Sequence, residues 1–172
     1  GMADDTAAPL MIDHIEADRF SALGGEAVLL VDAARFVRPS APVQAVIIGV
    51  DAVGAIPAVH ADDFDLLLTT ANSPPRAWVG LAADDFQRRV EALAGVARSW
   101  PVAATMTCQT LRAGERLCFD QALLLESLAY STLLGGAEFA QWRAGQEAAS
   151  AASSQNASVR YDRDGDDVTL TL

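Results

Sequence analysis

Apolar positions in the first half of the chain form short continuous runs. Such runs span residues 28–31, 43–50 and 64–70, with a shorter one at 78–81 after a break of sequence NSPP at 72–75. Continuous runs of β-branched and aliphatic residues are typical of strands that are covered on both faces. This pattern predicts a small sheet of three or four mainly parallel strands.

Apolar positions in the second half recur at helical spacing. A first helix is predicted to start at Asp84, which together with Gln87 fits a capping box, and to stop at Pro101. Pro101 also suits the first turn of a second helix, which would end at Gly114. The first helix has one apolar face. The residues of this face are Phe86, Val90, Leu93, Ala94 and Ala97.

The last part of the chain predicts two more helices and a hairpin. The helices begin near Asp120 and Ala137, and a small, polar stretch at 148–158 has the composition of a linker. After it, Asp164-Gly165 stands between two strand-like runs, which is a strong hairpin signal.

The predicted elements together indicate an α/β fold, in which a small, mostly parallel sheet is followed by a C-terminal helical segment. We expect one domain at 1–147, a linker at 148–158 and a terminal β-hairpin at 159–172.

The composition excludes several classes of function. The 172 residues carry a net charge of −11 and a pI near 4.4, so the chain repels nucleic-acid phosphates and anionic lipid head groups. Its longest apolar stretch, 43–59, is too short and interrupted to span a bilayer. The acidic start lacks the basic region of a signal peptide. We expect a cytoplasmic protein without nucleic-acid or membrane partners.

The C-terminal helical region carries a family resemblance. Residues 123–143 read LLLESLAYSTLLGGAEFAQWR, in which Glu126 precedes Glu138, Phe139 and Trp142. This segment resembles the last helices of the crotonase (enoyl-CoA hydratase/isomerase) superfamily. Upstream, residues 90–111 are similar to a helix, proline, helix stretch of that family, with Gln109 in place of a usual lysine.

The strand region departs from the family at its chemistry. Residues 42–70 follow the order of the family's central strand, glycine triplet, short helix and next strand, with Gly49 as the strand-end glycine. Gly54 matches the amide that donates to the thioester oxygen, where fixed donors stabilise the developing enolate. Val53 and Ala55 replace flanking glycines, and Pro57 stands where hydratases place a catalytic glutamate.

The resemblance implies a partial ClpP/crotonase spiral fold in a truncated or degenerate member. About fifty residues that are present in the family are missing between Trp78 and Asp84. The hairpin at 159–172 resembles the opening of a crotonase domain. Either the chain leads into a following crotonase domain, or it is a rearranged half-fold that uses the hairpin in its own sheet.

Several polar residues are candidates for a site, but no catalytic set can be assembled from them. His60, Asp62, Asp63 and Asp65 could hold a divalent metal or supply a base, although the spacing matches no ligand motif and favours a solvated helix start. His14, beside Asp13 and Glu16, has the same two interpretations, with a surface position favoured. We predict no metal site.

The basic residues near the cysteines suggest a weak ligand site. Arg112 and Arg116 are the best pair for a CoA phosphate, because the guanidinium fork suits phosphate. They could also lower the pKa of Cys108 or Cys118, but the cysteines have no zinc-ligand spacing and buried structural thiols are the favoured interpretation. Glu126 is expected to be structural, paired to an arginine or capping a neighbour.

Three functions follow from these residues. The leading one is a crotonase-like module without catalysis of its own, which forms a homo-oligomer through its C-terminal helices or associates with an active partner in acyl-CoA metabolism. The second is an atypical acyl-CoA hydratase/isomerase that uses a Gly54 oxyanion hole, with Asp51 or His60 as base and a coenzyme A thioester as ligand. The third is an interaction domain without a ligand site.

Overall fold

The computed structural model describes residues 19–40, 42–150, 160–164 and 167–171. The chain divides into two compact units, Gly1–Leu133 and Leu134–Leu172, and each is described by itself. His14 and most of the predicted linker lie outside the described residues. The predicted domain division at residue 147 stays a prediction.

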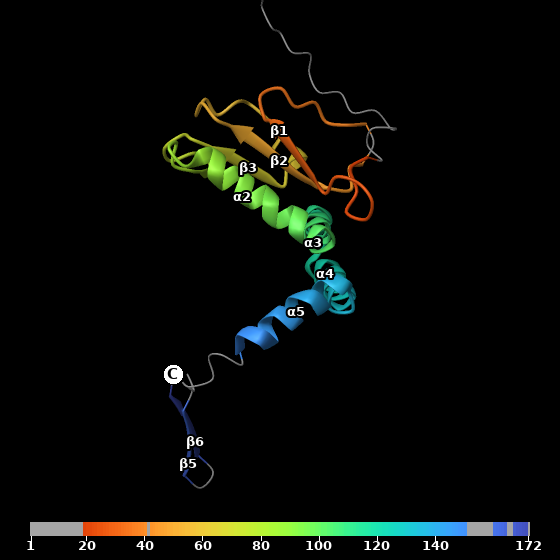
Figure 1. Ribbon diagram of the computed structural model, residues 1–172, viewed down its shortest axis with the longest axis vertical. Coiled ribbons are helices and arrows are strands. Elements are labelled where there is room, and N and C mark those ends of the chain that lie inside the picture. The colour runs from red at the N-terminus through yellow and green to blue at the C-terminus, as the bar shows by residue number, and fades with distance from the viewer. Residues whose placement is uncertain (1–18, 41, 151–159, 165–166, 172) are drawn as a thin grey trace, which may run out of the picture. The chain divides into compact units, whose positions relative to one another are not determined.

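A four-stranded parallel sheet forms the centre of the first unit, in the order β1-β2-β3-β4 (Figure 1). The strands are β1 (Val28–Asp32), β2 (Val46–Asp51), β3 (Leu66–Thr69) and β4 (Trp78–Gly80). The predicted α/β class and parallel sheet are therefore confirmed.

The connections between the strands cover one face of this sheet. Parallel strands usually return through a helix, but within the described residues these three connections contain only a short 3-10 helix, η1 (Ala61–Asp63). Phe64 follows η1 and packs with Phe36 at 5.0 Å between ring centroids. The buried side chains of this layer are Phe20, Leu29, Val31, Ala33, Val43, Ala45, Ile47, Phe64 and Leu67. Because Val43 and Ala45 are buried outside β2, the apolar run is longer than the strand it predicts.

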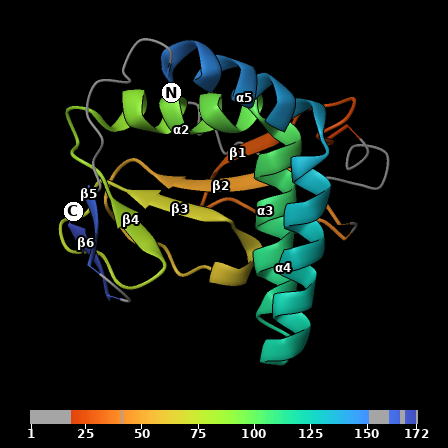
Figure 2. The same cartoon turned by 90° about the horizontal axis from the view of Figure 1, so that it is seen from below.

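Helix α2 (Phe86–Ser99) covers the opposite face of the sheet (Figure 2). Phe86, Val90, Ala94 and Ala97 are buried in it, as the helical spacing predicts. They pack against residues that point to this face from the strands, among them Val28, Val46, Ile48 and Leu68. Leu93, which the apolar face also includes, is 41% exposed and lies at its margin.

The start of α2 differs from the expected capping box. The residue before the helix is Asp85, one position later than predicted, and its carboxylate caps no backbone amide. Instead it accepts hydrogen bonds from Arg88 and Arg89. The two guanidiniums compete with the first amides of α2 for the same carboxylate. The predicted capping box of Asp84 and Gln87 was therefore wrong.

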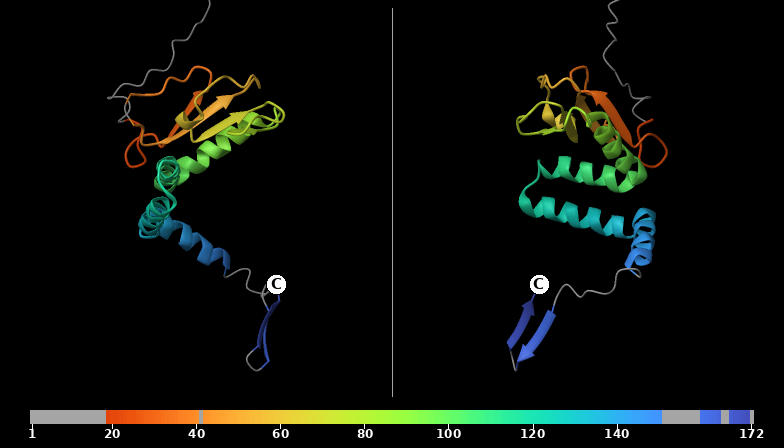
Figure 3. Two further views of the ribbon diagram at one scale, coloured as in Figure 1. Left: turned by 180° about the vertical axis from the view of Figure 1, so that it is seen from behind. Right: turned by 60° about the vertical axis from the view of Figure 1, so that its left-hand side comes forward.

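Two further helices form an antiparallel hairpin in the first unit. Helix α3 (Pro101–Gly114) has its proline in the first turn, as predicted, and α4 (Phe119–Leu134) follows after a short turn. Figure 3 shows the two helices side by side. Thr105 of α3 is buried, and Ala104 and Cys108 of the same helix pack against the layer under α2.

The second unit contains α5 (Ala137–Ser150) and a hairpin of β5 (Arg160–Asp164) and β6 (Asp167–Thr171). Phe139 and Trp142 of α5 stack with 5.7 Å between ring centroids. The pairing of β5 with β6 confirms the predicted hairpin, which is a two-stranded antiparallel sheet.

Gly49 tests how tightly the loop-covered face is packed. A Cβ at this position of β2 would lie 2.6 Å from Phe64 Cδ1 and 2.8 Å from Leu67 Cδ2, both on buried side chains. We expect Gly49→Ala to lower the free energy of unfolding by about 1–3 kcal/mol, because the core must shift to admit the methyl group. Urea unfolding followed by circular dichroism measures this change.

Gly95 provides the matched control. A Cβ there, on α2, would meet no atom within 4 Å. Gly95→Ala should therefore stabilise the protein by up to about 1 kcal/mol through helix propensity alone. Equal effects of the two substitutions would contradict the packing described for Gly49.

Candidate functional site

The loop after β2 folds around the carboxylate of Asp51. Asp51 ends the strand and is 5% exposed. Its Oδ1 accepts from the amides of Val53 and Ala55 at 3.3 and 3.2 Å, and its Oδ2 accepts from the amide of Ile56 at 2.8 Å. Three loop amides are therefore directed at one side chain.

The neighbouring strand completes this network. Thr69 of β3, which is fully buried, donates its hydroxyl to Asp51 Oδ2 at 2.8 Å and accepts from the amide of Ala71 at 3.1 Å. Burial of Asp51 favours its neutral form, but the hydrogen bonds from Ile56, Thr69, Ala55 and Val53 outweigh burial and lower its pKa. Asp51 is therefore an anion at neutral pH.

Gly54 adopts a conformation that glycine permits at little cost. Its φ is +72°, and a Cβ there would lie 3.1 Å from the backbone nitrogen of Ala71 and 3.2 Å from Thr70 Oγ1. Ile56 also has a positive φ, of 48°. The backbone at Gly54 therefore packs closely against the chain's own loop after β3.

The residues next to Gly54 do not provide a side chain that could act as an acid or a base. Val53 is 85% exposed, Ala55 is exposed, and Pro57 is half-buried in the same loop. His60 is exposed and precedes η1, where its carbonyl accepts from the amide of Asp63. No side chain here combines with the Asp51 carboxylate as a second titrating group.

A groove of about 660 Å³ lies between the loop-covered face of the sheet and α3. Its floor includes the apolar residues Ile47, Phe64 and Leu67, and Ala77 with a φ of +83° also lines it. The charged residues that line it are Arg38, Arg112, Arg116, Asp62, Asp63, Asp65 and Glu115. Three guanidiniums thus face four carboxylates, which gives the groove no excess positive charge.

An ion pair closes one side of the groove and ties α3 to the sheet. Arg112 donates through Nε to Asp65 Oδ1 at 2.7 Å. Its Nη2 donates to Asp65 Oδ2 and, at 3.2 Å, to the carbonyl oxygen of Ala45. Asp65 Oδ2 also accepts from the amide of Ile47 at 2.7 Å. The side chain of Asp65 is 5% exposed and that of Arg112 is 31% exposed.

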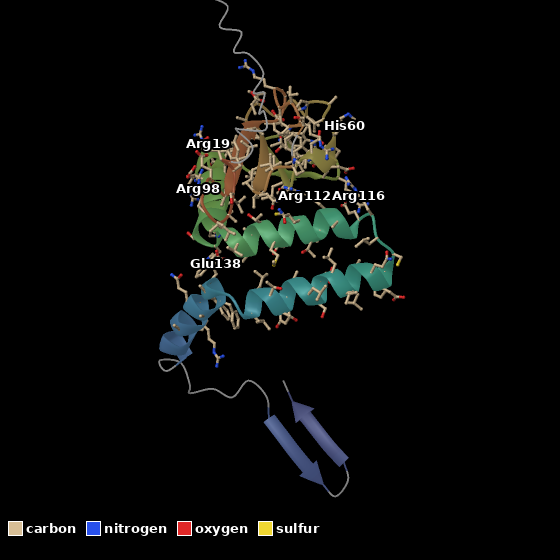
Figure 4. The ribbon with its side chains drawn as sticks, turned by 90° about the vertical axis from the view of Figure 1, so that its right-hand side faces the viewer. Arg19, His60, Arg98, Arg112, Arg116 and Glu138 are labelled. Carbon is tan, nitrogen blue, oxygen red and sulfur yellow. The ribbon has the colours of Figure 1, made fainter. Side chains whose placement is uncertain are left out.

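The two arginines of the predicted CoA site therefore differ in their availability. Arg112 and Arg116 lie near the same end of α3 (Figure 4), and both line the groove. The fork of Arg112 is already engaged by a carboxylate, whereas Arg116 is exposed. Arg38, across the groove, pairs with Asp63 at 3.0 Å. A phosphate would have to compete with carboxylates that the protein supplies.

The two cysteines differ in their burial. Burial raises the pKa of the Cys108 thiol to about 11, with a further contribution from the Asp65 carboxylate that outweighs the opposing charge of Arg112. A raised pKa disfavours the thiolate, which is the reactive form, in line with a structural thiol. Cys118 is exposed, so the expectation that it is buried was wrong. Gln109, in the place of the family's lysine, donates to Gln44 at 2.8 Å.

The acidic residues around η1 form ion pairs, and Glu126 is exposed. Among the described residues, no group of three or more histidine, cysteine or acidic side chains is placed to hold a metal ion. Asp63 and Asp65 each face an arginine instead. Glu126 is exposed on α4, and the arginine partner or capping contact expected for it is not formed within the described part of the chain.

Two features of this region were not predicted from the sequence. The Asp51 network had a local signal, because an aspartate followed by a glycine-containing turn commonly accepts hydrogen bonds from the next amides. The pair between Asp65 and Arg112 had none, since its members are far apart in sequence and come together only through the packing of α3.

Comparisons with known proteins add no assignment: no protein-family model, curated protein or solved structure matches this chain. Among the described helices, none has the length and apolar content needed to cross a membrane.

Asp51→Asn tests the loop network. The folded pKa of Asp51 is below its unfolded value near 3.8, so the ionised group stabilises the fold at neutral pH, and this contribution is lost as the pH falls through the folded pKa. We expect the variant to lose about 2–3 kcal/mol of unfolding free energy near neutral pH, with a deficit that shrinks toward about pH 3. Urea unfolding at both pH values measures this.

Asp62→Asn serves as control, because it makes the same chemical change at an exposed position. It should change stability by less than about 0.5 kcal/mol. A deficit for Asp51→Asn that is as large in acid as at neutral pH would contradict the ionised network.

Arg112→Gln tests the ion pair of the groove. Removing the guanidinium leaves the buried Asp65 carboxylate without its partner, and we expect a loss of about 2–4 kcal/mol of unfolding free energy. Combining it with Asp65→Asn should cost at least about 1 kcal/mol less than the sum of the two single changes. Arg116→Gln, at an exposed position of the same groove, is the control and should have little effect. Additive losses in the double variant would show that the pair is not coupled.

Proposed function

We propose that this chain is a crotonase-like module of the enoyl-CoA hydratase/isomerase type that has no catalysis of its own. It acts as an oligomerisation or partner module in acyl-CoA and fatty acid metabolism, in the cytoplasm. Its parallel sheet, followed by a helix, a proline and a second helix, is consistent with a partial ClpP/crotonase spiral. The same arrangement accommodates the family motifs read from the sequence.

The observation that carries the absence of catalysis is the engagement of the loop amides by Asp51. Stabilising an enolate requires donors aimed at the position of the developing oxyanion. Here the amides of Val53, Ala55 and Ile56 are aimed at a carboxylate of the protein. An anion held beside Gly54 would also repel the negative charge that develops on a thioester oxygen.

The same network argues against Asp51 as a general base. An effective base has a pKa near the working pH, whereas hydrogen bonding lowers the pKa of Asp51 from an already acidic value. Each of its two oxygens already accepts two hydrogen bonds, so at least one of these bonds would have to break before Asp51 could accept a proton. The atypical hydratase that uses Gly54 and Asp51 is therefore the weaker alternative.

Association is supported by the exposed apolar surface of the C-terminal helices. Among these residues, Phe119 is 78% exposed and Trp142 is 49% exposed. Large apolar side chains at such exposure are typical of surfaces that bind a protein partner. We propose a second copy of the chain as the partner, and a following crotonase domain as a further one.

The groove beside Arg112 and Arg116 is the place where a coenzyme A thioester would bind if the module retains a ligand. Its balance of three arginines and four carboxylates weakens that proposal, and so does the net charge of −11. The alternative of an interaction domain without any ligand site differs from the leading proposal only in lacking this coenzyme A site.

A turnover assay on crotonyl-CoA tests the absence of catalysis. The loss of the enoyl thioester absorbance should not exceed that of the buffer, because the loop amides and the carboxylate of Asp51 are engaged with each other. An active enoyl-CoA hydratase measured under the same conditions is the positive control. Titration of the chain with crotonyl-CoA in a calorimeter measures binding separately.

Turnover at an ordinary enzyme rate, on the order of 10 per second, would overturn the proposal. If turnover occurs, Gly54→Pro distinguishes a Gly54 oxyanion hole, which would lose its amide donor, from a site elsewhere on the chain. Saturable binding without turnover would support a pseudoenzyme that retains a ligand.

A further inference from the structure

The backbone amides of the loop after β2 converge on one point. The sign of φ alternates along this loop, since φ is positive at Gly54 and Ile56 but not at Val53 and Ala55. Such alternation curls the backbone so that its amides point into one concavity, a nest of the kind that binds anions. The occupant of this concavity is the carboxylate of Asp51. The loop thus has the geometry of an anion site whose ligand comes from the same chain.

The donors of this site match the shape of a carboxylate. Asp51 Oδ1 accepts from two amides, and Oδ2 accepts from the amide of Ile56 and the hydroxyl of Thr69, both at 2.8 Å. A carboxylate offers two oxygens with about four acceptor positions, and all four are used here. A single atom such as chloride could reach only one of the two pairs of donors. The site therefore selects its ligand by shape as well as by charge.

Dipoles hold the negative charge in this loop. Burial opposes the ionised form of Asp51, and the groups that lower its pKa are three amides and the hydroxyl of Thr69. Donors of this kind stabilise an anion even in a chain with a net charge of −11. They also remain in the loop when the side chain of Asp51 is removed.

Contacts that do not involve the Asp51 side chain hold the loop in place. Thr70 donates its hydroxyl to the carbonyl of Ala52 at 3.2 Å and its amide to the main-chain carbonyl of Asp51 at 3.2 Å. Gly54 packs against Ala71, where a Cβ would lie 3.1 Å from the backbone nitrogen. The donors should therefore keep their positions without the carboxylate, and donors that are already in position bind a ligand at lower cost.

We propose that residues 52–57 form a carboxylate-binding nest and that Asp51 occupies it as an autoinhibitory contact, which excludes carboxylates from solution. This inference rests on the engagement of the loop amides that the proposed function also uses. It adds to that function the class of ligand and the contact that controls its access.

Asp51→Gly tests the nest, because it removes the occupant and leaves room for formate, the smallest carboxylate. Formate has three non-hydrogen atoms, so its dissociation constant should lie no lower than about 1 mM. Urea unfolding of the full chain measures binding. Formate at ten times its dissociation constant should lower the unfolding equilibrium constant of the variant about tenfold. Sodium chloride at the same concentration is the control and should not produce this change.

Asp51→Asn is the matched control variant. Its side-chain amide fills the space of the carboxylate without the charge, so formate should affect its unfolding no more than chloride does. The parent chain should behave in the same way, because its nest is occupied. Asp51→Ala repeats the test of Asp51→Gly without the added backbone freedom of glycine.

Nuclear magnetic resonance locates the bound formate. In ¹⁵N-labelled Asp51→Gly, the amide protons of Val53, Ala55 and Ile56 should move downfield as formate is added, because each donates a hydrogen bond to it. The shifts should saturate with the dissociation constant obtained from unfolding. In Asp51→Asn these amides should not move.

The outcomes separate the nest from the proposed function. Equal effects of formate and chloride on Asp51→Gly, or shifts confined to other amides, overturn the nest. So does a result in which Asp51→Gly and Asp51→Ala both stay unfolded at every formate concentration. A formate-specific effect on the parent overturns the autoinhibitory contact. Turnover in the crotonyl-CoA assay would overturn the absence of catalysis and leave the nest in place.

Discussion

A buried carboxylate with four hydrogen-bond donors organises the part of the molecule on which the functional argument depends. Asp51 draws the loop after β2 back toward the sheet, and Thr69 connects that loop to β3. The free energy lost by removing the Asp51 charge from water is offset by hydrogen bonds from three amides and a hydroxyl, which favour the ionised carboxylate. The conformation of Gly54 follows from this closure, as does the direction of the neighbouring amides.

Much of the fold could be predicted from local sequence. The four strands, the helices after Pro101 and near Asp120, and the hairpin turn at Asp164 each depend on residues that lie close together in the chain, so their spacing was sufficient. The wrong predictions concerned contacts and burial that are set only when the whole chain folds. Asp85 binds arginines instead of capping α2, and Cys118 lies in an exposed turn. Neither outcome is visible in a pattern of apolar positions.

The candidate site was harder to predict than the fold. The residues Val53, Ala55 and Pro57 led to the expectation of a loop without catalysis, which stays a prediction, and they did not indicate the hydrogen bonds that the loop makes. That required Thr69 and Ala71, which the parallel register of β2 and β3 brings beside Asp51. The ion pair of Arg112 with Asp65 is still harder to predict from the sequence, because α3 reaches the sheet only after α2 has crossed its other face. Long-range contacts of this kind are set by packing and leave no spacing in the sequence.

The position of α3 has a mechanical consequence. One side of this helix is fastened to Ala45 and Asp65 through Arg112, and its neighbour in the hairpin is α4. On the same helix, Ala104 and Cys108 pack against the layer under α2. The helix therefore cannot slide along the sheet without breaking both the directional bonds of a guanidinium and apolar contacts.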